Sequence, residues 1–389
     1  ADEPTTALDV TVQQTILDLL KDLQKEYNMG MIFITHDLGV VAQIAQKIVV
    51  MYKGKTVEQG NVQQIFNAPQ HPYTKGLIAC KPPLNSRPER LLTVADFLNE
   101  SISIPIIKQI EQTQRTTAHQ KLYAVNPLLQ VQKLTTQFIT KKGFIKPTTT
   151  ILNAVDEVSF DVYKGETLGL VGESGCGKST LGRSILRLIE PSAGKIIYNN
   201  RNLLELSANE MLQMRSKMQL IFQDPFSSLN PRITVGNAIA EPIEVHGIAK
   251  NKDEIREKVM KLLLRVGLTE QHFDRYPHEF SGGQRQRIGI ARTLAVEPEF
   301  IVCDESVSAL DVSVQAQVLN LLNELKEEFK LTYIFISHDL SVVKYMCDKI
   351  IVMQKGKIVE MAEADELYLN PQSEYTKKLI DAIPTTQMV

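Results

Sequence analysis

The sequence has no tryptophan, only four cysteines, and no apolar run near the roughly eighteen residues that a membrane span needs. The cysteines lie far apart and show none of the pairing that is typical of metal sites or disulfide-rich folds: Cys80, Cys176, Cys303 and Cys347. We therefore expect a soluble globular protein in a reducing, cytoplasmic setting. If the protein works at a membrane, it would then do so through partner proteins.

A strong excess of charge is also absent. The 43 Lys and Arg residues nearly balance the 45 Asp and Glu residues, and basic residues are interspersed with acidic ones. Nucleic-acid binding is therefore not predicted, because it would need a broad basic surface. With 43% apolar residues, the chain can bury one full domain core and a partial one.

A glycine-rich loop at residues 172–180 follows an apolar run, 167–171, that predicts a strand. In such a loop, small residues let backbone N–H groups turn toward phosphate oxygens, and the helix expected from near Ser179 directs its positive end at them. Lys178 would reach the β and γ phosphates, and Ser179 a magnesium ion. A glycine-rich surface turn is the alternative. The candidate nucleotide-binding residues are Gly172, Glu173, Ser174, Gly175, Cys176, Gly177, Lys178, Ser179 and Thr180.

Two carboxylates end a second apolar strand, expected at residues 300–305. A buried strand of this kind would bring its last residues beside the phosphates. Asp304 would then hold magnesium through water, and Glu305 would polarise the attacking water. Seen alone, the pair is equally compatible with a solvated sheet edge.

Two further segments lie where a site that hydrolyses a bound nucleotide would need them. Ser281 is expected to cap a helix that runs to about Ala295, with glycines behind it that allow close approach of an anion. His338 follows a third apolar strand, where it could touch the γ phosphate and the water. The alternatives are a plain helix cap and a solvated histidine.

Taken together, these residues resemble the nucleotide-binding domain of ABC transporters, over residues of about 126 to 389. The resemblance implies an α/β fold: a P-loop NTPase of ABC type with a RecA-like core, an antiparallel β subdomain and a helical subdomain. It implies an ATPase that uses ATP and Mg2+, with Glu305 and His338 as catalytic residues. The implied metal site comprises Ser179, Gln223 and Asp304.

In this family, ATP lies between two domains, and a signature sequence completes the site from the opposite side. The signature here is Ser281, Gly282, Gly283 and Gln284, and the resemblance implies that Ser281 and Gly283 act in trans. The family often stacks adenine on an aromatic residue before the phosphate loop. The expected position falls near Thr149, and the nearest aromatic is Phe144, so the stacking residue is left open.

The first residues of the chain repeat the later motifs at one offset. Asp2 and Glu3 align with Asp304 and Glu305, and 304 minus 2 gives an offset of 302 residues. At the same offset His36 aligns with His338, and Ala7-Leu8-Asp9-Val10 repeats Ala309-Leu310-Asp311-Val312. We therefore predict an internal duplication with a partial first copy and a complete second copy.

The duplication predicts three parts. Residues 1–90 would be the C-terminal part of a first ABC domain with its extension, 91–125 a linker, and 126–389 a complete second domain with its own extension. Because the first copy begins inside its carboxylate strand, we expect a fragment of a longer protein. On this interpretation, Asp2, Glu3 and His36 form a partial first site without a phosphate loop.

Two segments narrow the resemblance to importers of dipeptides and oligopeptides, with glutathione and nickel complexes as related substrates: residues 223–231 and the His-Pro-Tyr-Thr-Lys segment at 71–75. This family implies membrane subunits as partners, a substrate-binding protein beyond them, and a peripheral place on the cytoplasmic face of the membrane. The second copy departs from it with Ser373-Glu374-Tyr375-Thr376. A soluble tandem ABC ATPase acting on ribosomes or nucleic acid is the alternative.

Overall fold

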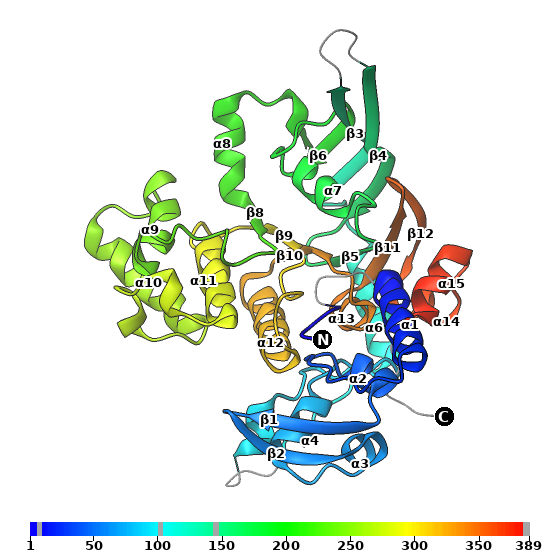
Figure 1. Cartoon of the computed structure of the whole chain (residues 1–389). Helices are drawn as coiled ribbons and strands as arrows, with labels where there is room; N and C mark the ends of the chain where they lie inside the picture. Colours follow the sequence, from blue (N-terminus) through cyan, green and yellow to red (C-terminus); the bar gives the residue numbers. More distant parts are fainter. Residues whose placement is uncertain (6–9, 100–103, 143–147, 384–389) are drawn as a thin grey trace.

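The structure is a computed structural model that describes residues 1–5, 10–99, 104–142 and 148–383. The repeated segment at residues 7–9 and Phe144 lie outside these ranges. Figure 1 shows the N-terminal residues as a separate lobe beside a larger body formed by the rest of the chain. Among the described residues, no helix combines the length and the apolarity that crossing a membrane requires.

A six-stranded sheet forms the centre of the larger body, in the order β12-β11-β5-β10-β9-β8. Its strands are β5 (Thr167–Val171), β8 (Met218–Ile221), β9 (Phe300–Asp304), β10 (Thr332–Ile336), β11 (Lys349–Gln354) and β12 (Lys357–Glu363). All neighbouring pairs are parallel except β11 with β12. Every residue of β5, β9 and β10 is buried, as continuous apolar strands inside a parallel sheet should be. The carboxyl ends of these three strands therefore meet at one edge.

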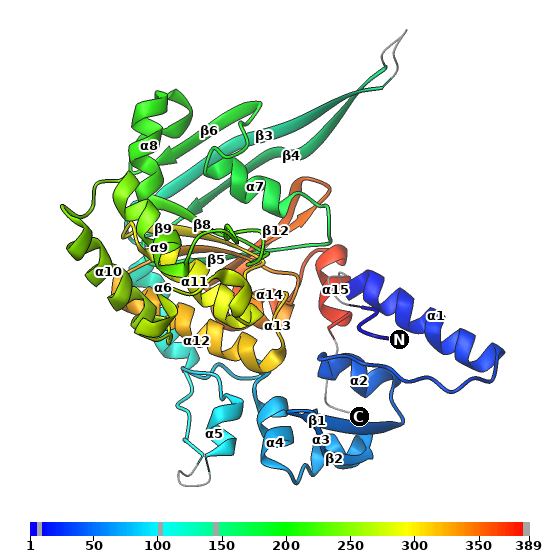
Figure 2. The same cartoon turned by 60° about the vertical axis from the view of Figure 1, so that its left-hand side comes forward.

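A four-stranded antiparallel sheet covers one side of this centre. Its order is β4-β3-β6-β7, with β3 (Leu129–Lys142), β4 (Thr148–Val162), β6 (Ala193–Tyr198) and β7 (Arg201–Asn202). Helix α7 (Lys178–Ile185) contacts strands of both sheets, and its buried Leu181 and Ile185 belong to the core between them (Figure 2). The helix that follows the phosphate loop is thus fixed on two sides.

A group of helices projects from the central sheet, at the left of Figure 1. It comprises α9 (Val235–Val245), α10 (Lys252–Arg265) and α11 (Gly282–Leu294). The remaining helices of the larger body are α8 (Ala208–Lys217), α12 (Val312–Phe329), α13 (Leu340–Met346), α14 (Ala364–Leu369) and α15 (Glu374–Asp381). The fold is therefore an α/β P-loop fold with an antiparallel sheet and a helical subdomain, as the motifs indicate.

The N-terminal lobe contains α1 (Val10–Glu26), α2 (Leu38–Ile44), β1 (Lys47–Tyr52), β2 (Lys55–Asn61), α3 (Val62–Asn67) and α4 (Pro72–Ala79). Its hairpin β1–β2 pairs Lys47 with Asn61 and has an irregularity after Val50. The hairpin β11–β12 pairs Lys349 with Glu363 and has an irregularity after Val352. The two hairpins therefore correspond position by position, at the same offset that relates Asp2 to Asp304.

A strand equivalent to β10 is not formed by the described residues of the N-terminal lobe. The apolar residues Met31–Ile34 make only an isolated bridge between Ile34 and Asp2. Their counterpart β10 lies between β5 and β9, which supply hydrogen bonds on both edges. Without such neighbours in the described lobe, the segment cannot complete a ladder.

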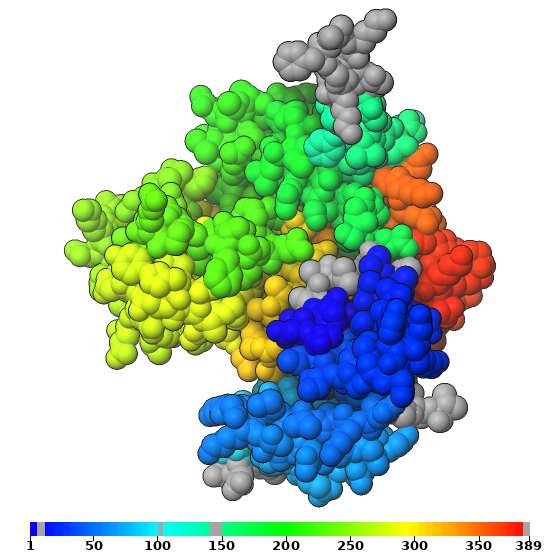
Figure 3. Space-filling view, in the orientation of Figure 1, coloured from blue at the N-terminus to red at the C-terminus, as the bar shows by residue number. Residues whose placement is uncertain are grey.

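Residues 91–125, expected to be a linker, connect the two parts in a folded form. They contain α5 (Val94–Leu98), which packs on α4 of the N-terminal lobe, and α6 (Gln112–Leu122). In the face seen in Figure 3, the blue N-terminal residues lie against the yellow and red parts of the larger body. Arg115 is buried and pairs with Glu363 at 2.6 Å and with Asp365. The backbone of Leu91 exchanges two 2.9 Å hydrogen bonds with the Asn320 side chain. Apolar periodicity misses α6 because its buried residue is an arginine.

Candidate active site

The glycine-rich loop at 172–177 has a backbone that only glycine can adopt at two positions. Gly172 has a φ of 146° and Gly177 a φ of 109°. A Cβ atom on Gly172 would lie 2.2 Å from the Met353 carbonyl oxygen, and one on Gly177 would lie 2.0 Å from that of Ala154. The loop lies between strand β5 and helix α7 and packs against neighbouring backbone. Its N–H groups lie at the start of the helix.

Lys178 is the first residue of α7, and its side chain is buried. Its Nζ atom donates hydrogen bonds to the carbonyl oxygens of Gly172 at 2.7 Å and Glu173 at 2.9 Å. The ammonium group thus lies along the loop, where it and the positive end of α7 both favour an anion.

Ser179 and Asp304 join the loop to the end of β9. The Ser179 hydroxyl donates to Asp304 Oδ1 at 2.6 Å, while Arg183 contacts Asp304 Oδ2 at 3.2 Å. Asp304 is only 1% exposed, so its carboxylate is held in place. Hydroxyl, carboxylate and amide oxygens are ligands that Mg2+ accepts. Ser179 and Asp304, with Gln223 lining the same pocket, therefore fit a magnesium ion.

Glu305 lies at the end of β9, held from two other segments. The Gln223 amide donates to Glu305 Oε2 at 2.8 Å, and His338 Nδ1 lies 3.4 Å from the same oxygen. Glu305 has a φ of 47°, a left-handed conformation that costs energy for a residue with a Cβ. Its side chain is thereby directed from the strand end toward the loop pocket.

The charges of this pair shift both of their pKa values. Burial alone would raise the pKa of Glu305, but the hydrogen bond and charge of His338, with the charge of Lys178, lower it overall. Burial alone would lower the pKa of His338, yet the hydrogen bond and charge of Glu305 raise it above its ordinary value. The carboxylate is therefore kept ionised and able to accept a proton from water.

Predicted residues from four distant segments meet in one pocket. It is lined by Ser174, Gly175, Gly177, Lys178, Ser179, Thr180, Gln223, Glu305 and His338, together with Phe138, Leu152 and Ala154. Gly172, Glu173 and Cys176 form the adjoining part of the loop, and Asp304 lies behind it through Ser179.

The predicted signature residues lie elsewhere. Ser281 caps α11, with its hydroxyl accepting the Gln284 N–H and the Gln284 side chain accepting the Ser281 N–H. A Cβ on Gly283 would lie 2.3 Å from Val314, so the start of α11 packs tightly on α12. Gly282 is the first residue of α11. Among the described residues that line the phosphate-loop pocket, none belongs to 281–284.

The partial first site reproduces one contact of the second. His36 Nδ1 lies 2.9 Å from Glu3 Oε1, matching the pair formed by His338 and Glu305. Glu3 also has a left-handed backbone, with a φ of 42°, and Asp2 bridges to Ile34. The carboxylate of Glu3 is more exposed than that of Glu305, at 43% against 16% of the side chain.

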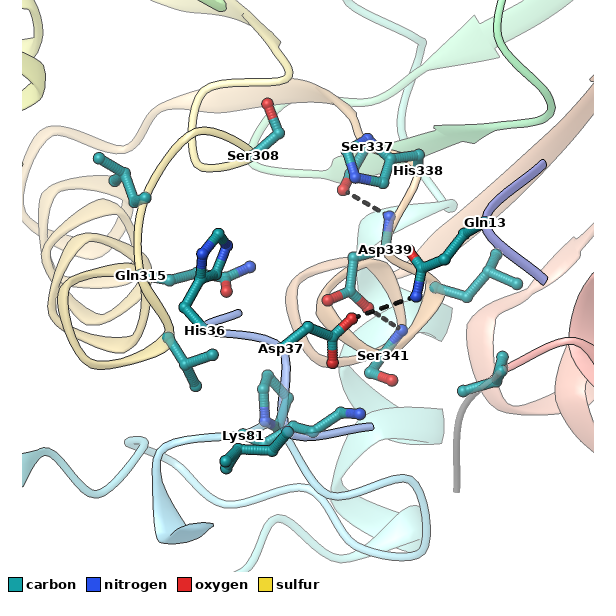
Figure 4. A pocket seen from close by; sticks show the side chains of 16 residues that line it. Gln13, His36, Asp37, Lys81, Ser308, Gln315, Ser337, His338, Asp339 and Ser341 are labelled. Carbon is teal, nitrogen blue, oxygen red and sulfur yellow. Dashed lines mark hydrogen bonds between the residues drawn. The ribbon is translucent and has the colours of Figure 1, made fainter. Parts of the chain in front are cut away.

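A second pocket lies between the N-terminal lobe and the larger body (Figure 4). His36, Asp37 and Lys81 approach it from the lobe, opposite Ser308 and Asp339 of the larger body. His36 therefore lies at the same cavity as Ser308, in the segment that follows Glu305.

Phe138 is a pocket residue that sequence reasoning missed. It lies on β3, is 42% exposed and lines the phosphate-loop pocket. The expected position near Thr149 came from counting back from Lys178, whereas Phe138 lies on β3, before that position in the sequence. The signal that could have found it is its strand, Leu129–Lys142, which pairs with β4, the strand that precedes β5 in the sequence.

Two family models match the chain. A model described as ABC transporter matches residues 155–308, and one described as Oligopeptide/dipeptide transporter, C-terminal region, matches both 57–99 and 359–388. Fold, site and matches together resemble those of ABC-type ATPases.

Similar proteins agree with this class. The chain is 48% identical over 389 residues to the Glutathione import ATP-binding protein GsiA of Shigella dysenteriae serotype 1 and to that of Escherichia coli strain K12. All of this chain is covered, but it spans 61% of the length of each relative.

Two solved structures have a TM-score of 0.54 and 27% identity with this chain. One is a dimeric post-hydrolysis state of the ATP-binding cassette MJ0796 bound to ADP and Pi, with 61% of this chain and 98% of that chain covered. The other is cbiO1 from Clostridium perfringens, part of the ABC transporter complex cbiONQ, with 63% and 92% covered. The chain is thus similar to ATP-binding proteins of ABC transporters, and among them to import proteins of the oligopeptide, dipeptide and glutathione type.

Proposed function

We propose that the chain is the ATP-binding and ATP-hydrolysing part of an ABC importer for peptides or related small solutes such as glutathione. The observation that carries the proposal is the position of Glu305, held by Gln223 and His338 at the pocket of the phosphate loop. The names of the relatives and the match to a transporter C-terminal region support the importer role.

The site residues have distinct roles in this proposal. The loop N–H groups and Lys178 would bind the phosphates, and Ser179, Gln223 and Asp304 would hold a magnesium ion, which would neutralise charge on the phosphate oxygens. Glu305 accepts the proton of the attacking water, and His338 orients the Glu305 carboxylate and keeps it ionised. Phe138 offers an aromatic face to the adenine.

A second ATPase domain is needed to complete the site. The signature residues 281–284 lie outside the pocket of their own domain, which favours action on another domain's nucleotide. Two observations support a tandem arrangement of residues 1–90 and 126–389: the matching hairpin registers and the two matches to one C-terminal region. The partner domain would be a completed first copy or another chain.

Membrane subunits are the proposed mechanical partners, reached through the segment that follows Gln223. Phe226 in this segment is 63% exposed, and the Arg285 guanidinium lies 3.5 Å from its ring centre. An apolar ring supported in this way can enter a partner's groove. The chain would thus work peripherally, on the cytoplasmic face of the membrane, with substrate delivered by a separate binding protein.

Affinity purification of the chain from detergent-treated membranes of its source cells tests the proposal, with Lys178→Ala as a second sample for ATP binding. We expect membrane subunits of a peptide-type importer to co-purify, and the variant to lose at least about tenfold in ATP affinity because it lacks the ammonium group. Co-purification of ribosomal or DNA-bound complexes alone would contradict the importer role.

A further inference from the structure

The C-terminal helix of the chain touches the phosphate loop directly. The backbone N–H of Glu173, the second residue of that loop, donates a hydrogen bond of 3.0 Å to the hydroxyl of Tyr375 on α15. The two residues are 202 positions apart in the sequence. Because the donor is backbone, this contact depends on the tyrosine hydroxyl and not on the identity of residue 173.

Helix α15 is itself fixed to the central sheet. The Glu360 carboxylate on β12 accepts the N–H groups of Gln372 at 2.8 Å and Ser373 at 2.9 Å. The Ser373 hydroxyl caps the helix by accepting the Tyr375 N–H, and Thr376 is 1% exposed on the buried face. These contacts set the place of the Tyr375 ring, so its hydroxyl is presented to the loop by a rigid support.

The loop is held at a second point by the same region of the chain. The Gly356 N–H, in the turn between β11 and β12, donates to the Cys176 carbonyl oxygen at 2.9 Å. Gly172 packs so closely on Met353 that no side chain fits there. The loop is thus tied at Glu173 by α15 and at Cys176 by the hairpin, both of which lie after His338 in the sequence.

The N-terminal lobe contains the same support without a phosphate loop. Tyr73 is the counterpart of Tyr375 in the repeat, and the Tyr73 N–H donates to the capping residue His71. Glu58 accepts the N–H groups of Gln70 and His71, as Glu360 does for its own helix. The Tyr73 ring stacks on Tyr52, with ring centres 4.2 Å apart. The two tyrosines therefore share a scaffold, and the Tyr375 hydroxyl in addition accepts a hydrogen bond from the phosphate loop.

We propose that Tyr375 is a positioning residue for the phosphate-binding loop, through which α15 sets how tightly the loop binds ATP. The inference rests on the proposed function, because it concerns the affinity of the same pocket. Tyr375 contacts the loop at Glu173, at the start of the loop, whereas Glu305 and His338 follow other strands. Losing the hydroxyl should therefore weaken nucleotide binding more than it slows turnover at saturating ATP.

The test compares Tyr375→Phe with the matched control Tyr73→Phe in the full chain. ATP and ADP titrations should show about threefold to tenfold weaker binding for Tyr375→Phe, the value of one hydrogen bond, and no change for Tyr73→Phe. Turnover at saturating ATP should stay within about twofold of wild type. Hydrogen exchange should be faster in the peptide containing Glu173 in Tyr375→Phe alone.

Several outcomes would overturn the inference. Unchanged affinity and exchange in Tyr375→Phe would show that the hydroxyl does not position the loop. Equal weakening in both variants would assign the effect to general stability. A wild-type chain that binds no ATP would instead contradict the proposed function. Failure of the inference and failure of the proposed function can therefore be distinguished.

Discussion

His338 and Glu305 lie 3.4 Å apart, Nδ1 to Oε2, at the carboxyl ends of adjacent strands β10 and β9. His36 and Glu3, which align with them at the 302-residue offset, form the same contact at 2.9 Å. Glu305 and His338 line the phosphate-loop pocket, and among the described residues that line it neither Glu3 nor His36 occurs, so the first pair serves as a control for the second.

Replacing His338 by alanine should destabilise the protein in a pH-dependent way. Because folding raises the pKa of His338, the stabilisation that His338 provides is complete below pH 6.5 and is lost as the pH rises through the pKa of the folded state. Folding lowers the pKa of Glu305, so its contribution is present above 4.5 and is lost as pH falls through the folded value. In urea unfolding, His338→Ala should lower the free energy of unfolding by on the order of 1 kcal/mol at about pH 5 to 6.5. At about pH 9 the decrease should be smaller.

The matched variant for this experiment is His36→Ala. Its pair is more exposed, at 34% and 43% of the two side chains, so water screens it and the loss should be smaller. A loss for His338→Ala of equal size at both pH values would show that the variant acts through packing and not through the charge of the pair.

Phe138 should contact the adenine ring. Removing its aromatic face in Phe138→Ala should lower ATP affinity by about 1 to 2 kcal/mol, the range for an aromatic ring stacked on a base. Because the chain has no tryptophan, Phe138→Trp introduces a single fluorescent reporter, whose emission should change on adding ATP. Phe329→Trp, on α12 and 40% exposed, is the matched control. An ATP response from the control alone would refute the assignment.

Ser281→Arg should separate nucleotide binding from hydrolysis. The signature does not line the pocket of its own domain, so ATP affinity should stay within about twofold of wild type while hydrolysis is lost. Ser207→Arg removes the cap of α8 in the same manner and serves as the control. If the signature acts on the nucleotide of another domain, as proposed, hydrolysis by wild type should also rise steeply with protein concentration. Constant turnover per chain would mean that one chain completes its own site.

Much of the site follows from the sequence because its chemistry is local. Gly172 and Gly177 are needed where neighbouring backbone leaves no room for a Cβ, and Ser281 caps the helix that its motif predicts. The buried strands that end at Asp304 and before His338 were predicted from apolar runs alone. Parallel pairing then brings their ends together.

Other features could not be predicted because they depend on distant contacts. Phe138 reaches the pocket through the pairing of two long strands, and counting along the sequence does not reveal this. Arg115 docks an otherwise polar helix through two acids near the other end of the chain, Glu363 and Asp365. The contact of Tyr375 with the loop likewise depends on where α15 packs.

The most direct test of the account measures ATP binding and hydrolysis by the wild-type chain, Glu305→Gln and the matched control Glu3→Gln. If Glu305 accepts the proton from water, Glu305→Gln should bind ATP with at least wild-type affinity and lose at least about a hundredfold in turnover. Glu3→Gln should behave as wild type, because Glu3 is not among the described residues that line the phosphate-loop pocket. Normal turnover by Glu305→Gln would contradict the central claim.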